Sequence, residues 1–249
     1  MREADRRSAI RQKLARMEGR RAPAAIATGF AALDSALGVG GLPRGRMVEI
    51  FGPPSCGKTT LVLQIVATAQ QKGAMAAWID AEHVFDPTFW GSLGVSLDRL
   101  TVAQPTAAEE ALEIARRLTV SGALDMVVID SAAALVPELE LRAGIGDNSP
   151  GLQGRVLASG LRRLSLAVAK TDTAVVFLNH SYARGESGGS ESESSAGGAP
   201  LKLYAAVRIA LGSDARGGLT FRVLKNRVGE AFGEGRLTRA EGGGFVKTP

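Results

Sequence analysis

Between residues 52 and 59 the chain reads Gly-Pro-Pro-Ser-Cys-Gly-Lys-Thr, which fits the pattern G-x-x-x-x-G-K-[ST] of a phosphate-binding loop. An apolar stretch precedes the loop and a helix-forming stretch follows it, as this motif requires. Backbone N–H groups at the start of a helix suit phosphate oxygens, Lys58 supplies charge to the β- and γ-phosphates, and the Thr59 hydroxyl is expected to hold Mg²⁺. The candidate nucleotide-binding residues of this stretch are Gly52, Ser55, Cys56, Gly57, Lys58, Thr59 and Thr60.

The sequence around this loop alternates between strand and helix patterns. Uninterrupted apolar runs, such as 126–129 and 174–178, are typical of strands that are buried on both faces of a sheet. We therefore predict an α/β fold with a mainly parallel central sheet and helices on both faces. Strands are predicted at 47–51, 74–80, 100–103, 126–130, 174–179, 206–211 and 219–224, and helices at 59–71, 107–119 and 151–170.

Polar residues follow several of these strands at their carboxyl ends, the edge where open parallel sheets bind ligands. Asp130 ends one strand and is expected to reach the same Mg²⁺ as Thr59. Glu82 follows another strand and is the candidate to orient and polarise the attacking water, which makes Glu82 and Lys58 the candidate catalytic residues. Asn179 and His180 end a third strand, from which they can contact the γ-phosphate. A helix-capping surface carboxylate and a turn histidine are the alternatives for Glu82 and His180.

Composition and charge restrict the class of protein. The chain has 249 residues, 45% of them hydrophobic, which suits a globular protein rather than a disordered one. The net charge of +5 is carried by the first 22 residues, so basic composition alone does not predict nucleic-acid binding. The single cysteine excludes an internal disulfide, and the sequence has neither a long apolar span nor a signal core. We therefore expect a soluble, cytoplasmic protein that does not bind membranes.

The sequence divides into three expected segments. Residues 1–25 are expected to form a basic amphipathic helix at 4–17 and a linker, residues 26–232 the core, and residues 233–249 a Gly-rich tail. Within the core, residues 181–198 are dominated by Gly, Ser and Glu, and we expect a mobile loop there.

Several blocks of this sequence, in the same order, resemble the RecA family of recombinases. They include the loop 52–59, Ile79-Asp80-Ala81-Glu82-His83, residues 128–135 and Val223-Leu224-Lys225-Asn226-Arg227, together with 41–50, 86–87, 145–147 and 201–204. The resemblance covers roughly residues 26–232. It implies a RecA-like ATPase core that uses ATP and Mg²⁺, places the nucleotide between neighbouring subunits of a homo-oligomer, and binds single-stranded DNA along a filament.

The resemblance also implies roles for individual residues. It gives Lys58, Thr59 and Asp130 the nucleotide and Mg²⁺ positions, and Glu82 that of the catalytic carboxylate. Asp86 and Phe89 fall in the adenine-binding segment, where Phe89 replaces the usual tyrosine. Lys225 and Arg227 match the basic pair that caps a neighbouring subunit's triphosphate. His180 stands where bacterial members usually carry glutamine and where archaeal and eukaryotic members carry histidine.

The expected DNA-binding residues are fewer than is usual for the family. Arg155 and Arg162 lie seven residues apart and share one face of a predicted helix, for which an exposed solubilising face is the alternative. The family's second DNA loop carries basic and bulky apolar residues, whereas residues 181–196 turn to Gly, Ser and Glu after Arg184, so we expect weak DNA binding. The candidates are Arg142, Arg155, Arg162, Arg163, Tyr182 and Arg184.

These observations lead to one main hypothesis and two alternatives. The chain is expected to have a shorter N-terminus than the family and to lack its usual C-terminal domain. The main hypothesis is therefore a regulatory paralogue in DNA repair and the SOS response, similar to RecA-like accessory proteins of translesion synthesis, that hydrolyses ATP slowly in a DNA-dependent manner. Its partners would be the host recombinase or an error-prone polymerase complex. The alternatives are a minimal recombinase that forms filaments on single-stranded DNA, and a non-catalytic interaction module stabilised by ATP.

Overall fold

The computed structural model describes residues 24–144, 149–182, 194–215 and 217–247. The predicted helix at 4–17, Arg184 and the side chain of Tyr182 lie outside this part of the chain. None of the helices in the described part is long and apolar enough to span a membrane.

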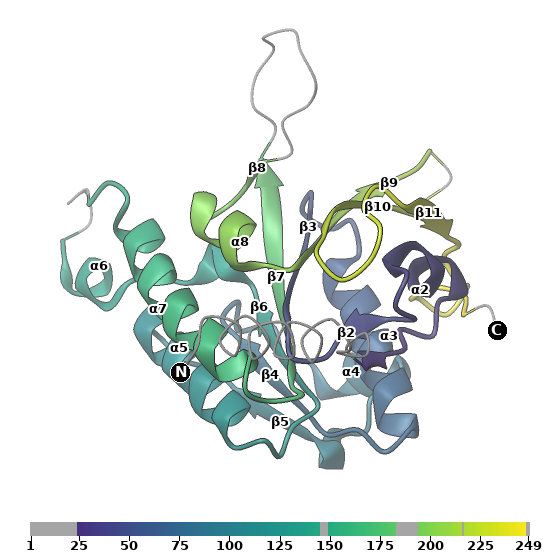
Figure 1. The fold of residues 1–249 in the computed structure, drawn as a ribbon, viewed down its shortest axis with the longest axis horizontal. Coiled ribbons are helices and arrows are strands. Elements are labelled where there is room, and N and C mark those ends of the chain that lie inside the picture. The colour runs from purple at the N-terminus through teal and green to yellow at the C-terminus, as the bar shows by residue number, and fades with distance from the viewer. Residues whose placement is uncertain (1–23, 145–148, 183–193, 216, 248–249) are drawn as a thin grey trace, which may run out of the picture.

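One large sheet organises the described residues, in the strand order β11-β10-β9-β3-β7-β6-β4-β5 (Figure 1). The six strands from β9 to β5 run parallel, and β10 and β11 join the β9 edge in antiparallel orientation. The prediction of a mainly parallel sheet is thereby confirmed. The strands are β3 (Met47–Gly52), β4 (Ala76–Asp80), β5 (Leu100–Ala103), β6 (Met126–Asp130), β7 (Ala174–Tyr182), β9 (Val207–Ser213), β10 (Leu219–Asn226) and β11 (Glu234–Leu237). A separate small sheet pairs β1 (Ala25–Ile26) with β2 (Leu42–Pro43).

Helices cover both faces of the sheet, as predicted (Figure 1). The first face carries α3 (Lys58–Gln71) and the short α4 (Pro87–Ser92). The second carries α5 (Ala108–Val120) and α7 (Leu152–Val168). The shorter helical elements are α2 (Ala31–Leu37), η1 (Leu97–Arg99), η2 (Ala132–Ala134), α6 (Glu138–Arg142) and α8 (Ala199–Tyr204).

The central strands are apolar on both sides because they separate two hydrophobic cores. In β6, Met126 and Val128 belong to the core under α3, whereas Val127 and Ile129 belong to the core under α5 and α7. Successive side chains of a strand point to opposite faces, so a strand between two helical layers needs an uninterrupted apolar run. This packing fixes the carboxyl ends of β3, β4, β6 and β7 at one edge of the sheet.

Two expected segment boundaries are wrong. Residues 233–249 are not simply a tail, because β11 pairs with β10 and Phe245 is buried against the rest of the core. At both ends of the loop expected at 181–198, the residues that the structure describes are paired. Ser181 and Tyr182 pair with the short strand β8 (Ser194–Ser195), and Ala196 N–H donates to the carbonyl of His180 at 2.9 Å.

Candidate nucleotide-binding and catalytic site

The loop at 52–59 connects the end of β3 to the first residue of α3. Gly57 precedes the helix with φ of 103°, a backbone conformation that favours glycine, and a Cβ atom there would lie 2.7 Å from Cζ of Phe245. The Lys58 side chain is buried within the loop, where its Nζ donates to the carbonyls of Gly52 at 3.1 Å and Pro53 at 2.8 Å. The loop therefore holds an ammonium group at the N-terminus of a helix, where phosphate oxygens bind.

Thr59 and Asp130 meet across the edge of the sheet. The Thr59 hydroxyl donates to Asp130 Oδ2 at 2.9 Å, and Asp130 is 2% exposed. Burial, together with the nearby charges of Glu82 and Asp80, raises the pKa of Asp130 to about 7, although the hydrogen bond from Thr59 and the charge of Lys58 act to lower it. A hydroxyl and a carboxylate are hard oxygen ligands of the kind that Mg²⁺ prefers, and a divalent cation would offset this crowding of negative charge. Thr59 and Asp130 therefore fit Mg²⁺.

Glu82 is held through only one of its two carboxylate oxygens. Its Oε1 accepts from the Ser131 hydroxyl at 2.5 Å and interacts with Nε2 of His180 at 3.0 Å. Burial favours a higher pKa, but the hydrogen bonds from Ser131 and His180, with the charge of Lys58, outweigh it and lower the pKa of Glu82. Within the described residues Oε2 has no hydrogen-bond partner. An ionised carboxylate with one free oxygen is suited to orient and polarise a water molecule.

His180 lies between Lys58 and Glu82, the two candidate catalytic residues. Its Nδ1 lies 3.4 Å from Lys58 Nζ, and its Nε2 faces Glu82. Since an ammonium only donates and a carboxylate only accepts, these partners assign the proton to Nε2 and leave Nδ1 as the acceptor. The end of β7 therefore couples the two catalytic candidates through one imidazole ring.

Asp80 fixes the turn that carries Glu82. It is fully buried, and its Oδ2 accepts from the backbone N–H of Phe85 and from Nε2 of Gln104, each at 2.9 Å. The turn also bonds to β6, because Ala81 N–H and Glu82 N–H both donate to the carbonyl of Asp130. Glu82 is thus positioned by the two neighbouring strands β4 and β6.

Two of the predicted nucleotide-binding residues, Asp86 and Asn179, have structural roles of their own, and a third, Phe89, is exposed. Asp86 caps α4, since its Oδ1 accepts from the backbone N–H groups of Thr88 at 2.9 Å and Phe89 at 3.0 Å. Phe89 is 42% exposed on that helix, so its ring is accessible to a ligand. Asn179 is fully buried, and its amide donates to Glu49 and to the carbonyl of Ala196 rather than pointing toward the loop at 52–59.

Lys225 lies near the end of β10 and Arg227 directly follows that strand, and in the described part of the chain neither bonds to the loop at 52–59. Lys225 Nζ donates to the carbonyls of Lys202 at 2.6 Å and Leu203 at 3.2 Å in α8. Burial, assisted by the positive charges of Arg227 and Arg208, lowers the pKa of Lys225 to about 8. Arg227 is exposed. Their predicted role at a neighbouring subunit's triphosphate stays a prediction.

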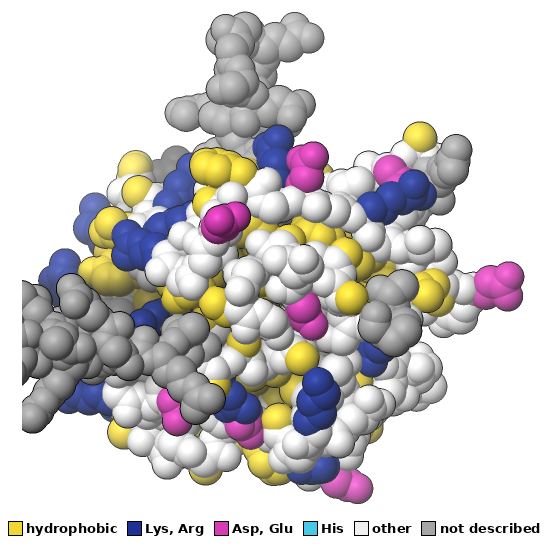
Figure 2. Space-filling model, turned by 45° about the vertical axis from the view of Figure 1, so that its right-hand side comes forward, with side chains coloured by type: hydrophobic (Ala, Val, Ile, Leu, Met, Phe, Trp, Pro, Cys, Tyr) yellow, Lys and Arg dark blue, Asp and Glu magenta, His cyan; other side chains and the backbone are white. Residues whose placement is uncertain are grey.

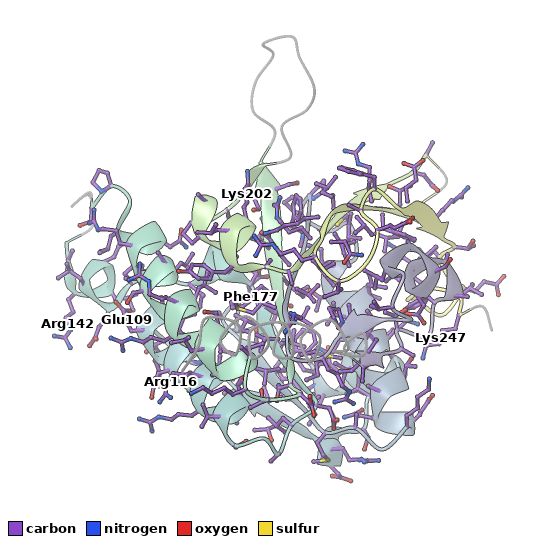
Figure 3. All side chains as sticks on the ribbon, in the orientation of Figure 1. Glu109, Arg116, Arg142, Phe177, Lys202 and Lys247 are labelled. Atoms are coloured by element: carbon purple, nitrogen blue, oxygen red, sulfur yellow. The ribbon has the colours of Figure 1, made fainter. Side chains whose placement is uncertain are left out.

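The predicted DNA-binding arginines are dispersed over the surface. Arg155, Arg162 and Arg163 are exposed on α7, whereas Arg142 is on α6 and pairs with Glu138. Figure 3 places Arg142 at the outer margin of the molecule, far from Lys202 on α8. In Figure 2 the basic side chains of one face are interspersed with carboxylates and apolar groups. If DNA binds to this protein through positive charge, it would therefore contact only a small group of neighbouring basic side chains.

Sequence reasoning missed four residues that support the site. Glu49 and Arg208 each carry a charge inside an otherwise apolar strand, and this exception to the pattern was the available signal. Asp80 and Ser131 lie at the carboxyl ends of β4 and β6, beside Glu82 and Asp130. Their contacts depend on the neighbouring strand, so spacing along the chain does not reveal them.

Comparison with known proteins agrees with this geometry. The family described as RecA N-terminal domain matches residues 9–232. Protein RecA of Frankia alni is 47% identical over 233 residues, which is 90% of this chain and 67% of that protein. Protein RecA of Chloroflexus aurantiacus is 46% identical over 230 residues, covering 88% of this chain and 65% of that protein. The chain thus spans about two thirds of the length of these relatives. Because the family match covers residues 9–232 and the relatives are 46–47% identical over about 90% of the chain, the chain belongs to the RecA family.

Proposed function

We propose that this protein binds ATP with Mg²⁺, hydrolyses it slowly in a DNA-dependent manner, and acts in DNA recombination and repair. The observation that carries the proposal is the meeting of Lys58, Thr59, Asp130, Glu82 and His180 at the carboxyl edge of one sheet. These residues come from three strand ends and one helix start, so the fold itself assembles the site.

Each residue has a separate task in this proposal. Bound Mg²⁺–ATP supplies an electrophilic γ-phosphorus and a metal that neutralises its oxygens. Lys58 and the N-terminus of α3 bind the phosphates, and Thr59 and Asp130 hold the metal. Glu82 orients the attacking water with Oε2 and accepts its proton, while Ser131 and His180 hold Oε1. Phe89 offers an exposed ring to the base.

Nucleotide binding and phosphate release test the proposal directly. We expect Lys58→Ala to weaken binding of a fluorescent ATP analogue by at least about tenfold, since it removes a buried cation from the phosphate site. Lys72→Ala is the matched control, because Lys72 is an exposed lysine just after the same helix. Glu82→Gln should retain binding and lower turnover by about 100-fold or more. If Lys58→Ala binds the ATP analogue as tightly as the unmodified protein does, the nucleotide site is refuted. If the unmodified protein binds nucleotide but does not hydrolyse it, an interaction module is favoured.

The acidic composition of residues 181–196 favours a regulatory role rather than the formation of filaments on DNA. Glu186, Glu191 and Glu193 would repel the phosphates of single-stranded DNA. In this role the partner is a host recombinase or an error-prone polymerase complex. Light scattering after size exclusion, with a non-hydrolysable ATP analogue and with or without oligo-dT, tests the point. We expect small assemblies in both samples, whereas long DNA-dependent filaments would indicate a minimal recombinase.

A further inference from the structure

Residues 238–246 form a short hairpin that follows β11. Arg239 and Phe245 pair across it in antiparallel orientation, and Val246 N–H donates to the carbonyl of Thr238 at 2.8 Å. The 238–246 hairpin is therefore held in one conformation by its own backbone bonds, and the direction in which it presents the Phe245 side chain is fixed.

A single side chain of α3 clamps this hairpin in place. Gln64 is buried, its Nε2 donates to the carbonyl of Phe245 at 3.0 Å, and its Oε1 accepts from the Phe245 N–H at 2.8 Å. A Cβ atom on Gly244 would lie 3.0 Å from Nε2 of Gln64, so glycine permits the close approach. The amide thus pairs with the backbone as a neighbouring strand would, and it satisfies both backbone polar groups of Phe245.

The clamp directs the Phe245 ring at the phosphate-binding loop. The ring is 2% exposed, and its tip, Cζ, is the atom that a Cβ on Gly57 would meet at 2.7 Å. The guanidinium of Arg239 lies over the ring, 5.6 Å from its centre. Gly57 comes directly before α3 and its carbonyl accepts from Leu61 N–H at 2.9 Å. The ring therefore fills the space beside the residue from which the helix starts.

This support matters because of the conformation of Gly57. Its φ of 103° belongs to a region that glycine enters freely and also leaves freely. Phosphate binds at the start of a helix only when the backbone N–H groups there point at its oxygens, and holding them in advance lowers the cost of binding. A side chain that restricts Gly57 from outside the loop can therefore set the affinity for the triphosphate.

We propose that Phe245, clamped by Gln64, is a positioning residue that keeps Gly57 and the phosphate-binding loop in the conformation that receives the β- and γ-phosphates. The inference rests on the proposed function, because it requires that the loop bind a triphosphate. Glu82 is positioned by β4 and β6 instead. The hairpin should therefore act on nucleotide affinity and KM, with little effect on kcat at saturating ATP.

Hydrogen exchange followed by NMR in the nucleotide-free protein tests the support itself. The Leu61 amide reports on Gly57, to whose carbonyl it bonds. In Phe245→Leu, which withdraws the ring tip but keeps an apolar side chain, this amide should exchange at least about fivefold faster than in the unmodified protein. Gln64→Met keeps the ring and removes both clamp bonds, and it should change the rate in the same direction.

Nucleotide affinity and turnover complete the test. Phe245→Leu should weaken binding of a fluorescent ATP analogue by about fivefold or more, while kcat stays within about twofold of the unmodified value. Phe221→Leu is the matched control, because Phe221 is 3% exposed in the same core and its Cζ lies 2.5 Å from the place of a Cβ on Gly235 in β11. It loses the same ring from the same kind of contact, away from the loop, and its affinity should not change.

The outcomes separate this inference from the proposed function. An unchanged Leu61 exchange rate or affinity in Phe245→Leu, or equal losses in Phe221→Leu, overturns the inference alone. If Phe245→Leu does not fold, Gln64→Met decides, and unmodified values of exchange and affinity in that variant overturn the inference. Failure of the unmodified protein to bind the ATP analogue overturns the proposed function and this inference with it, and it is recognised without any variant.

Discussion

The candidate catalytic carboxylate of Glu82 is held in place by the side chains of Ser131 and His180. Ser131 and His180 both contact Oε1, and among the described residues Oε2 has no hydrogen-bond partner. The same contacts lower the pKa of Glu82 although burial acts in the opposite direction, so the group stays ionised. Asp130, 2% exposed and beside two other carboxylates, has a raised pKa instead. Two acids on neighbouring strands are thereby suited to different roles, one to water and one to a cation.

Ser131→Ala should lower turnover without a matching loss of nucleotide affinity. The Ser131 hydroxyl donates to Glu82 at 2.5 Å, and a hydrogen bond to a charged group contributes about 1.5–3 kcal/mol. If half or more of that energy acts on the orientation of Glu82, kcat falls by about tenfold. Ser165→Ala is the control, because the Ser165 hydroxyl bonds only to a carbonyl of its own helix. Equal kcat values for the two variants would show that Ser131 does not position Glu82.

Lys225 gives a prediction about pH. Its pKa in the folded chain is about 8, below the ordinary 10.5, chiefly because of burial. Between these values the unfolded chain binds more protons than the folded one, so this group makes stability rise with pH from about 8 to 10.5. A triphosphate from a neighbouring subunit would require the charged form. Association driven by ATP analogue should therefore weaken as the pH rises through 8.

Lys225→Arg tests that expectation, because a guanidinium stays charged throughout this range. Light scattering of the ATP-analogue complex at several pH values between 7 and 9 should show a flatter profile for the variant than for the unmodified protein. Lys72→Arg serves as the control on an exposed lysine. Identical pH profiles for all three proteins would show that Lys225 takes no part in the contact between subunits.

At the scale of elements, long apolar or periodic segments were predictable and short ones were not. The strand expected at 100–103 has those bounds in the structure, and the helix expected at 59–71 begins one residue earlier. In contrast, β8 has two residues, and only its pairing with Ser181 and Tyr182 makes it a strand. The strand β11 contains a glycine and lacks a clear alternation, so its position beside β10 follows from tertiary contacts. Local sequence carries too little information for elements of this size.

The segment after β11 contributes to the phosphate-binding loop through Phe245. Its ring is 2% exposed and packs against Gly57, and its backbone N–H and carbonyl both bond to the side chain of Gln64 on α3. Phe245→Ala should lower the free energy of unfolding by about 3–5 kcal/mol, because it leaves a cavity beside the loop. Chemical denaturation measures the change. Val246→Ala, at an adjacent and 44% exposed position, should have a small effect, and equal losses in both variants would contradict this packing role.

For the molecule as a whole, the parallel sheet made the position of the site predictable from the sequence. The individual side-chain contacts within the site were not predictable. Parallel strands bring their carboxyl ends to one edge, so Asp130, Glu82 and His180 were expected to converge before any distance was known. The pairing of Ser131 with Glu82 and of Glu49 with Arg208 depends on which strands are neighbours. The packing of both cores sets the strand order. No short stretch of the sequence shows which strands become neighbours.

The location of positive charge leads to a prediction on the same scale. Arg162 and Arg163 are exposed on α7, and if they contact phosphates of single-stranded DNA, each contributes about 0.7 to the slope of log affinity against log salt concentration. Arg162→Ala/Arg163→Ala should therefore reduce that slope by about 1.4, measured by fluorescence anisotropy of labelled oligo-dT. Arg117→Ala is the matched control, since Arg117 is an exposed arginine of α5 that pairs with Glu113. A slope unchanged in the double variant would place DNA binding elsewhere, because the lost phosphate contacts must appear as fewer released counterions.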